Sequence, residues 1–385
     1  MENQVFGFFM PTVNLLGVGA VKEVGQRIKS LGRTKALIVT DAGLFKFGVA
    51  DQIAGYIREA GVEAAIFPGA EPNPTDKNVE AGLDAIKKEG CDIIVSLGGG
   101  SSHDCAKAIG LVAANGGRIH DYEGVDVSKS PMVPMIAVNT TSGTASEMTR
   151  FCIITDTARY VKMAIVDKHV TPSVSINDPI LTVKKPPALT AATGMDALTH
   201  AVEAYVSTIA TPITDACALK AISLISQNLR AAVANGEDIE AREAMSYAEF
   251  LAGMAFNNAS LGYVHAIAHQ FGGFYNLPHG VCNAILLPHV ERFNLIACPE
   301  RFVDIAAAMG EDVSGLSTRA AAEKALEAII TLSKDVGITQ GFAELGAKEE
   351  DIQTLAENAM KDACSFTNPR KATIQEVINI IKAAF

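Results

Sequence analysis

The chain has 385 residues, of which 49% are hydrophobic and 19% charged, so it is long enough to form about two domains with buried cores. Intrinsically disordered chains are poor in hydrophobic residues, which excludes that class. The formal net charge is −11, and an acidic surface repels both the phosphates of nucleic acids and anionic lipids. We therefore expect no nucleic-acid partner and no membrane partner.

The cysteines indicate a reducing compartment. There are seven, an odd number, and no two are spaced as a Cys-x-x-Cys pair. This pattern predicts buried thiols in a cytoplasmic protein, and it argues against a disulfide framework or a thiolate zinc site. Met1 to Gln4 carry no basic side chain, so we expect no signal peptide.

The first half of the chain alternates between strand-like and helix-like patterns. Short apolar runs predict strands at residues 35–41, 64–67, 92–97 and 135–140, and helical apolar spacing predicts helices at 49–60, 76–89 and 102–114. Strands that alternate with helices of about 10 to 15 residues form βαβ units, in which helices cover a parallel sheet. We therefore predict a Rossmann-like α/β dinucleotide-binding domain over residues 1–185.

The second half is different, because beyond Pro186 and Pro187 almost every pattern is helical. Helices are predicted at residues 190–206, 211–233, 241–257, 260–272, 321–336, 349–364 and 374–384. Few alternating β-branched runs occur there, so a second sheet domain is not expected. We predict an all-helical domain over residues 186–385, which would bind metal and substrate.

Three turns at the ends of predicted strands carry groups that can bind a nucleotide. Gly98–Ser101 opens a helix, and its glycines allow a phosphate to approach the backbone N–H groups. Ser101, with Asp104 three residues later, also resembles a capping arrangement that would fix the start of the helix. The segment is not the Gly-x-Gly-x-x-Gly fingerprint, and the alternative is a plain strand-to-helix turn. Asp41 would accept a hydrogen bond from a ribose hydroxyl or cap a helix, and residues 140–144 add hydroxyl groups. Together the three turns predict a nucleotide site.

One long stretch contains no strongly charged side chain. From Phe250 to Val290 the chain has no Asp, Glu, Lys or Arg, yet it holds half of the eight histidines. A membrane-spanning helix needs about 20 mostly apolar residues, and the histidines, asparagines and prolines of this stretch would be costly in lipid. We interpret it as protein interior.

The histidines in and before this stretch have the spacing of a metal site. Asp196 and His200 are four residues apart, as are His265 and His269, so each pair shares a helix face, and His279 follows in a Leu-Pro-His-Gly turn. A hydrogen-bonded core histidine is the alternative for any one of them. Burying several imidazoles without a shared partner is costly, however, and a carboxylate with several imidazoles suits Fe²⁺, Zn²⁺ or a neighbouring ion. The histidines interpreted as surface or turn residues are His103, His120 and His169.

Several motifs in order resemble those of the iron-dependent (group III) alcohol dehydrogenases. They are the glycine-rich segment 98–107, the segment 178–203 and the segment 262–282. The resemblance covers essentially the whole chain, and it is strongest to the NAD-dependent methanol dehydrogenases and related enzymes of short primary alcohols. It implies the fold of that family, which the dehydroquinate synthases share.

The resemblance also implies roles for individual residues. Those that match the metal ligands of the family are Asp196, His200, His265 and His279, while His269 matches an additional active-site histidine that relays a proton or contacts substrate. Those that match cofactor positions are Asp41, Asn73, Gly98, Gly99, Ser101, Thr140, Thr141 and Lys162, with Asp41 at the position that selects NAD over NADP. Phe151 and Phe271 depart from the family pattern near the expected nicotinamide and substrate pocket.

The expected activity is NAD-dependent oxidation of a short-chain primary alcohol to an aldehyde, and the reverse reduction. Methanol, ethanol, butanol and 1,3-propanediol all remain candidate substrates, since one methylene changes binding by only about 1–3 kcal/mol. The resemblance implies one divalent ion, with Fe²⁺ favoured over Zn²⁺, Ni²⁺ or Mn²⁺. It also implies a homodimer or larger homo-oligomer, in which Phe6–Val13 would pair as an N-terminal strand.

Other activities on the same architecture are a glycerol or polyol dehydrogenase, a lactaldehyde reductase and a lyase similar to dehydroquinate synthase. The resemblance gives the polyol dehydrogenases and lyases two histidine ligands, so His200, four residues after Asp196, favours the alcohol dehydrogenase branch. A different class is a metal-binding protein without catalysis. The appearance of NADH from NAD and a simple alcohol would distinguish an enzyme from that class.

Overall fold

The computed structural model describes residues 5–159 and 161–385, and it divides into two compact units. The first consists of the chain up to Thr141 together with Ala145–Thr182, and the second of Ser142–Thr144 together with Val183–Phe385. Met1 to Gln4, on which the expectation about a signal peptide rests, lie outside the described residues.

The first unit is built on a six-stranded sheet in the order β1-β9-β6-β4-β2-β3. Its strands are β1 (Val13–Leu16), β2 (Lys35–Asp41), β3 (Glu63–Ala70), β4 (Ile93–Gly98), β6 (Met135–Asn139) and β9 (Val174–Asn177). Every neighbouring pair runs parallel. The predicted parallel α/β sheet is confirmed, and the four expected strands correspond to β2, β3, β4 and β6. The short strands β1 and β9 were not predicted.

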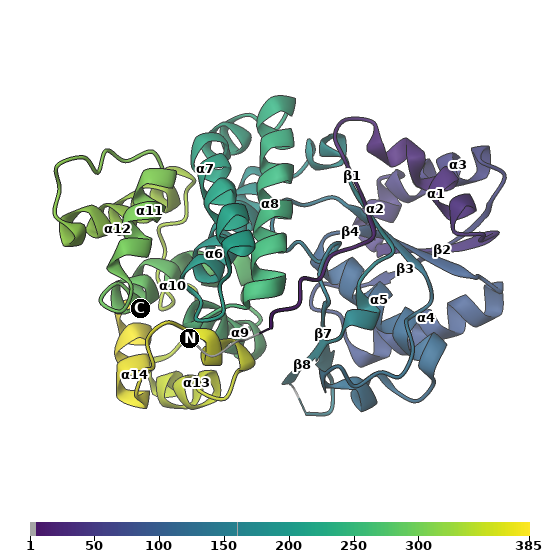
Figure 1. Cartoon of the computed structure of the whole chain (residues 1–385). Helices are drawn as coiled ribbons and strands as arrows, with labels where there is room; N and C mark the ends of the chain where they lie inside the picture. The colour runs from purple at the N-terminus through teal and green to yellow at the C-terminus, as the bar shows by residue number, and fades with distance from the viewer. Residues whose placement is uncertain (1–4, 160) are drawn as a thin grey trace. The chain divides into compact units, whose positions relative to one another are not determined.

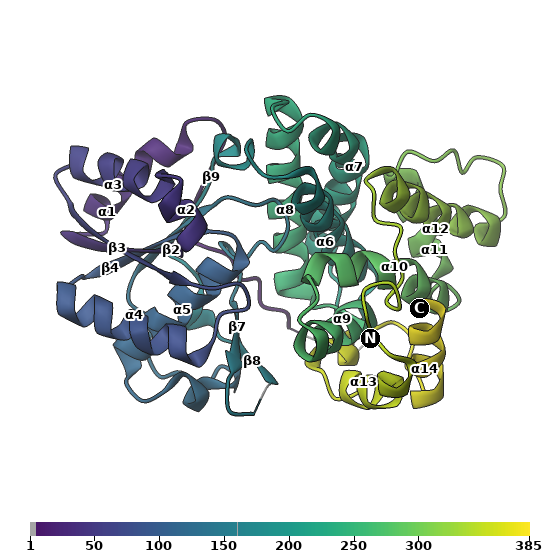
Figure 2. The ribbon, with the colours of Figure 1, turned by 180° about the vertical axis from the view of Figure 1, so that it is seen from behind.

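Helices cover both faces of this sheet (Figures 1 and 2). They are α1 (Val24–Ser30) and α3 (Val49–Glu59) on one face, and α4 (Asp76–Glu89) and α5 (Gly100–Asn115) on the other. Strand side chains alternate between the two cores, since Ile38 packs with α1 and α3 whereas Leu37 packs with α4 and α5. Burial on both faces explains why β2 reads as a continuous apolar run.

The chain reverses direction across the sheet between β2 and β4. From β2 it crosses to β3 at one edge, whereas from β4 it crosses to β6 and then to β9 on the other side. The crossovers therefore diverge at the carboxyl ends of these two strands, which is where α/β proteins bind ligands. Asp41 ends β2 and Gly98 ends β4, so two of the expected cofactor residues lie at these strand ends.

A small second sheet, in the order β5-β8-β7, completes the first unit. Its strands are β5 (Gly124–Val125), β7 (Phe151–Asp156) and β8 (Val161–Val166). β7 and β8 form an antiparallel pair that was not predicted, and Lys162 lies in it opposite Thr155. Of the segment 6–13, only Val13 belongs to a strand of the single chain.

The second unit is helical throughout, as predicted. Its α-helices are α6 (Pro187–Val206), α7 (Pro212–Ala234), α8 (Ile239–Ala259), α9 (Tyr263–Tyr275), α10 (His279–Asn294), α11 (Pro299–Ala308), α12 (Thr318–Asp335), α13 (Ile352–Ala359) and α14 (Ile374–Ala383). Two of them, α10 and α11, were not predicted. The single helix expected at 349–364 is instead α13 between two 3₁₀ turns, Glu349–Asp351 and Ala363–Thr367.

The stretch without strongly charged residues forms the end of α8, all of α9 and most of α10. Helix α9 begins at Tyr263 and not at 260, because Ser260 has a left-handed φ of 61° and Gly262 is extended. No helix of the described residues is both long enough and apolar enough to span a membrane. The interpretation of this stretch as protein interior is confirmed for His265, Phe271 and Asn283, which are almost completely buried.

Candidate functional site

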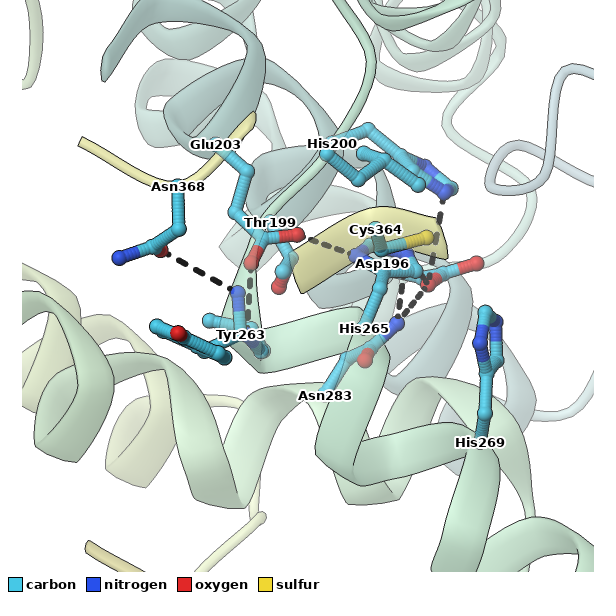
Figure 3. A network of polar contacts seen from close by, with 12 residues as sticks. Asp196, Thr199, His200, Glu203, Tyr263, His265, His269, Asn283, Cys364 and Asn368 are labelled. Atoms are coloured by element: carbon cyan, nitrogen blue, oxygen red, sulfur yellow. Dashed lines mark hydrogen bonds and ion pairs between the residues drawn. The ribbon is translucent and has the colours of Figure 1, made fainter. Parts of the chain in front are cut away.

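Four of the expected residues bring their donor atoms together in the second unit. Asp196 and His200 lie on α6, His265 on α9 and His279 at the start of α10 (Figure 3 labels the first three). One donor atom from each lies within 4.8 Å of the other three. The Asp196 Oδ1 atom is 4.0, 3.9 and 3.5 Å from the Nε2 atoms of His200, His265 and His279. Donors that share a tetrahedral first-row ion lie about 3.4 Å apart, so only slight tightening would be needed.

Local sequence explains why the donors converge. The i, i+4 spacing puts Asp196 and His200 on the same face of α6. Pro278 occupies the N-cap of α10, which makes His279 the first helical residue. Gly280 then allows α10 to begin directly against α6, because a Cβ atom there would be only 2.3 Å from the carbonyl oxygen of Ala192.

The side chain of Asn283 tests whether these residues suit a cation. Its Nδ2 atom lies 2.7 Å from Asp196 Oδ1 and 3.1 Å from Nε2 of both His265 and His279. The NH₂ group of Asn283 thus lies among one carboxylate oxygen and two imidazole nitrogens, each of which can accept a hydrogen bond. Its buried Oδ1 atom has no hydrogen-bond partner among the described residues. A donor with partial positive charge stands where a metal ion would sit, so the group fits a cation.

Burial keeps two of the imidazoles in the form that binds metal. Desolvation lowers the pKa of His200 and lowers that of His265 well below its usual value. Both rings are therefore neutral at pH 7, with a lone pair on one nitrogen. His279 is different, because its side chain is 31% exposed. The donor group is thus enclosed on three sides and open at His279, which leaves room for a further ligand.

The ring nitrogens that face away from the donor group have their own partners. His265 Nδ1 lies 2.5 Å from Glu203 Oε2, and His200 Nδ1 lies 3.2 Å from the carbonyl oxygen of Gly143. Such contacts hold a ring in one orientation. Figure 3 shows Glu203 reaching His265 from α6.

His269 lies beside the donor group without belonging to it. Its ring centroid is 5.9 Å from that of His265 and 5.5 Å from that of His279. Its Nδ1 atom pairs at 2.9 Å with Asp362. Burial by itself would raise the pKa of the Asp362 carboxyl group, but electrostatic attraction to His269 and the hydrogen bond between them lower it overall. This leaves Nε2 of His269, a partly exposed residue, available to another group.

The expected cofactor residues all lie in the first unit. Gly98 and Gly99 join β4 to α5, and the Thr140 N–H group donates to the Gly98 carbonyl oxygen at 3.0 Å. Gly98 has a left-handed φ of +149°, and a Cβ atom on Gly99 would lie 2.9 Å from Thr141 Oγ1. The backbone conformation therefore favours glycine at position 98, whereas at position 99 it is the Thr141 side chain that leaves little room for a Cβ atom. The buried Thr140 Oγ1 atom has no hydrogen-bond partner in the described part of the chain.

Three of the expected cofactor residues form hydrogen bonds of their own in the first unit. Lys162 Nζ donates to Asn73 Oδ1 at 2.9 Å, which joins β8 to the loop after β3. Asp41 caps α2 (Ala42–Lys46), because its Oδ1 atom accepts a hydrogen bond of 2.9 Å from the N–H group of Leu44. Asp41 is therefore the N-cap of α2, and this hydrogen bond uses only one of its two carboxylate oxygens.

The expected capping role of Ser101 and Asp104 is wrong. Helix α5 begins at Gly100 with Gly99 as N-cap and without a side-chain hydrogen bond. Asp104 instead accepts hydrogen bonds of 2.6 Å from Ser146 Oγ and 3.0 Å from the N–H group of Ile153. Ser101 is consequently not used as a cap.

Two other interpretations also need correction. His103 is not a surface residue: it is fully buried in α5, pairs with Ser96 Oγ at 2.6 Å, and burial lowers its pKa to about 3. Phe271 lies two residues beyond His269 and so on another side of α9, where it stacks on Phe342 with ring centroids 3.6 Å apart. Its departure from the family pattern therefore affects the core of the second unit. His120 and His169 do lie in partly exposed 3₁₀ turns, as expected.

Sequence reasoning missed Glu203, Asn283 and Asp362. The first two carried a usable signal, since Glu203 lies seven residues after Asp196 on α6 and Asn283 lies four residues after His279 on α10. Both spacings return a side chain to the same helix face. Asp362 carried none, because it contacts His269 across 93 residues of sequence.

Comparison with known proteins agrees with this arrangement. Residues 11–179 match the profile described as iron-containing alcohol dehydrogenase, and residues 190–385 match that of the Fe-containing alcohol dehydrogenase family, C-terminal. The chain belongs to the iron-containing alcohol dehydrogenase family. It is therefore an oxidoreductase that acts on the CH–OH group of small molecules, and membership implies dependence on a metal ion and on NAD(H).

Individual members are similar over their whole length. The chain is 59% identical to NAD-dependent methanol dehydrogenase from Bacillus methanolicus, with 98% of this chain and 99% of that protein covered. It is 57% identical to 1,3-propanediol dehydrogenase from Klebsiella pneumoniae, with complete coverage of both chains. A crystal structure of 1,3-propanediol oxidoreductase matches it with a TM-score of 0.98 and 57% identity over 99% of this chain and all of that one. The expected family and fold are thereby confirmed.

Proposed function

We propose that this enzyme oxidises short-chain primary alcohols to aldehydes with NAD, and catalyses the reverse reduction, at a divalent metal held by Asp196, His200, His265 and His279. The observation that carries the proposal is the convergence of these four donors, within 4.8 Å of one another, in a family of alcohol dehydrogenases. Methanol, ethanol, 1-butanol and 1,3-propanediol are the proposed substrates.

The donor set suits the chemistry of an alcohol. A divalent ion, when bound, acts as a Lewis acid that polarises the substrate oxygen and makes its proton easier to lose. Asp196 provides the only carboxylate of the four donors, and the three histidines are neutral ligands. The ion and its ligands would keep a formal net charge of +1, which favours an oxygen atom that is losing its proton.

His269 is the proposed proton relay. Asp362 holds its Nδ1 atom at 2.9 Å, so Nε2 is the nitrogen that can take up a proton from the substrate hydroxyl group. The side chain of His269 is 24% exposed. A proton on Nε2 can therefore pass on to solvent, and Asp362 would stabilise the ring while it carries the charge.

The first unit is proposed to hold NAD, which accepts or supplies the hydride. Gly98, Gly99 and Ser101 would present backbone N–H groups at the start of α5 to the pyrophosphate, and the left-handed φ of Gly98 supports close approach. Asp41 caps α2 through Oδ1, and its other carboxylate oxygen would accept hydrogen bonds from the adenosine ribose. The remaining proposed contacts are Asn73, Thr140, Thr141 and Lys162, of which Thr140 has an unpaired buried hydroxyl group in the described chain.

The lining favours uncharged substrates. Helix α9 and the first three turns of α10, which carry His265, His269 and His279, contain no Asp, Glu, Lys or Arg. An acidic or phosphorylated substrate would find no cation on these helices to pair with. This supports small alcohols and argues against a lyase of acidic sugars.

Iron is the ion that we propose, because the family is described by it, although the same donors accept Zn²⁺, Ni²⁺ or Mn²⁺. We also propose a cytoplasmic homodimer or larger homo-oligomer, with residues 1–185 and 186–385 as its nucleotide and metal domains. The seven cysteines, all without a disulfide, support a reducing compartment. Exposed Phe6, Phe8 and Met10 support an N-terminal contact between copies, and light scattering would measure the mass.

One experiment tests the activity and the metal together. The protein is stripped with a chelator, reloaded separately with Fe²⁺, Zn²⁺, Ni²⁺ or Mn²⁺, and assayed for NADH formation with methanol, ethanol, 1-butanol, 1,3-propanediol and glycerol. We expect no activity after stripping, recovery with Fe²⁺, and a preference for the unbranched primary alcohols over glycerol. His200→Ala should abolish the recovery and His169→Ala should preserve it. Full activity of the stripped protein, or no NADH with any alcohol, would refute the proposal.

A further inference from the structure

The buried carboxylate of Glu203 connects two parts of the metal-binding region. It lies on α6, seven residues after Asp196, and its side chain is only 1% exposed. Its two oxygen atoms have different partners: Oε2 lies 2.5 Å from His265 Nδ1, and Oε1 accepts a hydrogen bond of 2.7 Å from the N–H group of Val264. One carboxylate thus contacts both the ring of a proposed ligand and the backbone that carries it.

We propose that Glu203 is a positioning residue that fixes the orientation and tautomer of His265 for metal binding. This rests on the proposed function, because it assumes that His265 is a ligand. A carboxylate accepts a hydrogen bond and so keeps the proton on Nδ1, which leaves the lone pair on Nε2. Nε2 is the atom that faces Asp196 Oδ1, at 3.9 Å.

A second contact supports this tautomer independently. Asn283 Nδ2, which can only donate, lies 3.1 Å from His265 Nε2. A proton on Nε2 would oppose this NH₂ group, so the contact favours Nε2 as the acceptor and the proton of the neutral ring on Nδ1. The acceptor side points at the donor group and the protonated side points at Glu203.

Glu203 also fixes the helix that carries His265. Gly262, the N-cap of α9, forms no side-chain cap, and the Glu203 carboxylate receives the Val264 N–H group in its place. The first N–H groups of a helix have no acceptor within the helix, and Glu203 accepts one of them. A Cβ atom at position 262 would lie 2.9 Å from Glu203 Oε1, so glycine is what admits the carboxylate. The ring and the start of its helix are therefore held by one group.

Geometry explains why a carboxylate and not an amide fits this position. The backbone N–H group of Val264 faces Oε1 of Glu203, and the ring nitrogen Nδ1 of His265 faces Oε2. Glutamine has one acceptor oxygen and one NH₂ group, so it would oppose a donor with a donor at one of the two contacts. An isosteric change should thus disturb the position of His265 without creating a cavity.

Glu291 provides a matched control. It is fully buried in the same unit, and its Oε2 atom accepts a hydrogen bond of 3.1 Å from Asn294. Among the described residues, this hydrogen bond does not involve a proposed metal ligand. Glu291→Gln and Glu203→Gln therefore both replace a buried carboxyl group by an amide, and only the second changes the partner of His265.

The test measures metal binding directly. Wild type, Glu203→Gln and Glu291→Gln are stripped of metal, their folding is checked by circular dichroism, and Zn²⁺ affinity is measured by competition with a chromophoric chelator. The absorption spectrum of bound Co²⁺ reports the ligand geometry. We expect Glu203→Gln to bind Zn²⁺ about 10- to 100-fold more weakly and to alter the Co²⁺ spectrum, whereas Glu291→Gln should match wild type within about threefold. Glu203→Asp, which keeps the carboxyl group but withdraws it by one methylene, should lie between wild type and Glu203→Gln.

The outcomes separate this inference from the proposed function. If wild type binds no divalent ion, the proposed function fails. If wild type binds and folded Glu203→Gln binds equally with the same Co²⁺ spectrum, the role of Glu203 is refuted. Should the Glu203 variants not fold, ¹⁵N shifts of His265 in the wild-type protein decide the matter: a proton on Nδ1 supports the inference, and a proton on Nε2 overturns it.

Discussion

Replacing Glu291 by glutamine should make the free energy of unfolding depend less on pH between pH 4.5 and pH 8. Glu291 is fully buried, and desolvation raises its pKa from 4.5 to about 8. Its Oε1 atom has no hydrogen-bond partner among the described residues, so little opposes that desolvation. The native carboxyl group is consequently protonated at pH 7, whereas in the unfolded chain it is ionised.

The sign and size of the effect follow from proton linkage. Between pH 4.5 and pH 8 the native state holds one more proton at Glu291 than the unfolded state does, so stability falls as pH rises through this window. A shift from 4.5 to about 8 corresponds to roughly 5 kcal/mol, at about 1.4 kcal/mol per pH unit. Glutamine does not titrate, so the stability of Glu291→Gln should not fall for this reason as pH rises.

The assay compares the free energy of unfolding of wild type and Glu291→Gln in urea at pH 5, 6, 7 and 8, with the metal content held constant. We expect the free energy of unfolding of the variant to increase relative to that of wild type by about 1 kcal/mol per pH unit, and this increase to level off above pH 8. Any constant offset reflects repacking of the amide against Asn294 and does not affect the slope. A difference that is the same at every pH would refute the buried, protonated carboxyl group.

Three further changes test other parts of the structure. Asp362→Asn should lower kcat by about 10²-fold with unchanged metal content, because the His269 ring loses the carboxylate that stabilises it while it carries a proton; loss of metal would instead make this pair part of the metal site. Asp41→Gly should raise the use of NADP relative to NAD, measured as the ratio of kcat/KM values, and an unchanged ratio would leave Asp41 only its cap on α2. Phe271→Ala should destabilise the protein by about 3–5 kcal/mol in urea without changing KM for the alcohol, because the ring is buried against Phe342; a change in KM with stability retained would return Phe271 to the substrate pocket.

The donor group shows how a cation site can be assembled with few charges. Three imidazoles and one carboxylate meet where α6, α9 and α10 begin or pass close together, and Asn283 holds an amide NH₂ group among them. The carboxyl groups of Glu203 and Asp362 lie behind the rings of His265 and His269. Carboxylates placed behind imidazoles orient the rings without lowering the charge of the ion through direct ligation.

Elements with strong periodicity were predictable, and short or edge elements were not. Helix α4 was predicted with its observed bounds, since Thr75 and Asn78 form a capping box at its start and Gly90 ends it in a left-handed conformation. Strands β1 and β9 have only four residues each and lie at one edge of the sheet, so their patterns are too short to read. The helix expected at 349–364 failed because the apolar pattern continues across two 3₁₀ turns that local spacing does not reveal.

By itself the sequence determined the family and the order of the α/β and helical units, and it predicted the residues that we propose to bind metal or nucleotide. Those features depend on local spacing and on residue chemistry, and both can be read from the sequence. Only the tertiary structure decided what lies behind each histidine: Glu203 reaches His265 across 62 residues of sequence, Asn283 reaches Asp196 across 87, and Asp362 reaches His269 across 93. Such partners depend on how helices pack against one another, and periodicity within one helix carries no information about the face of another.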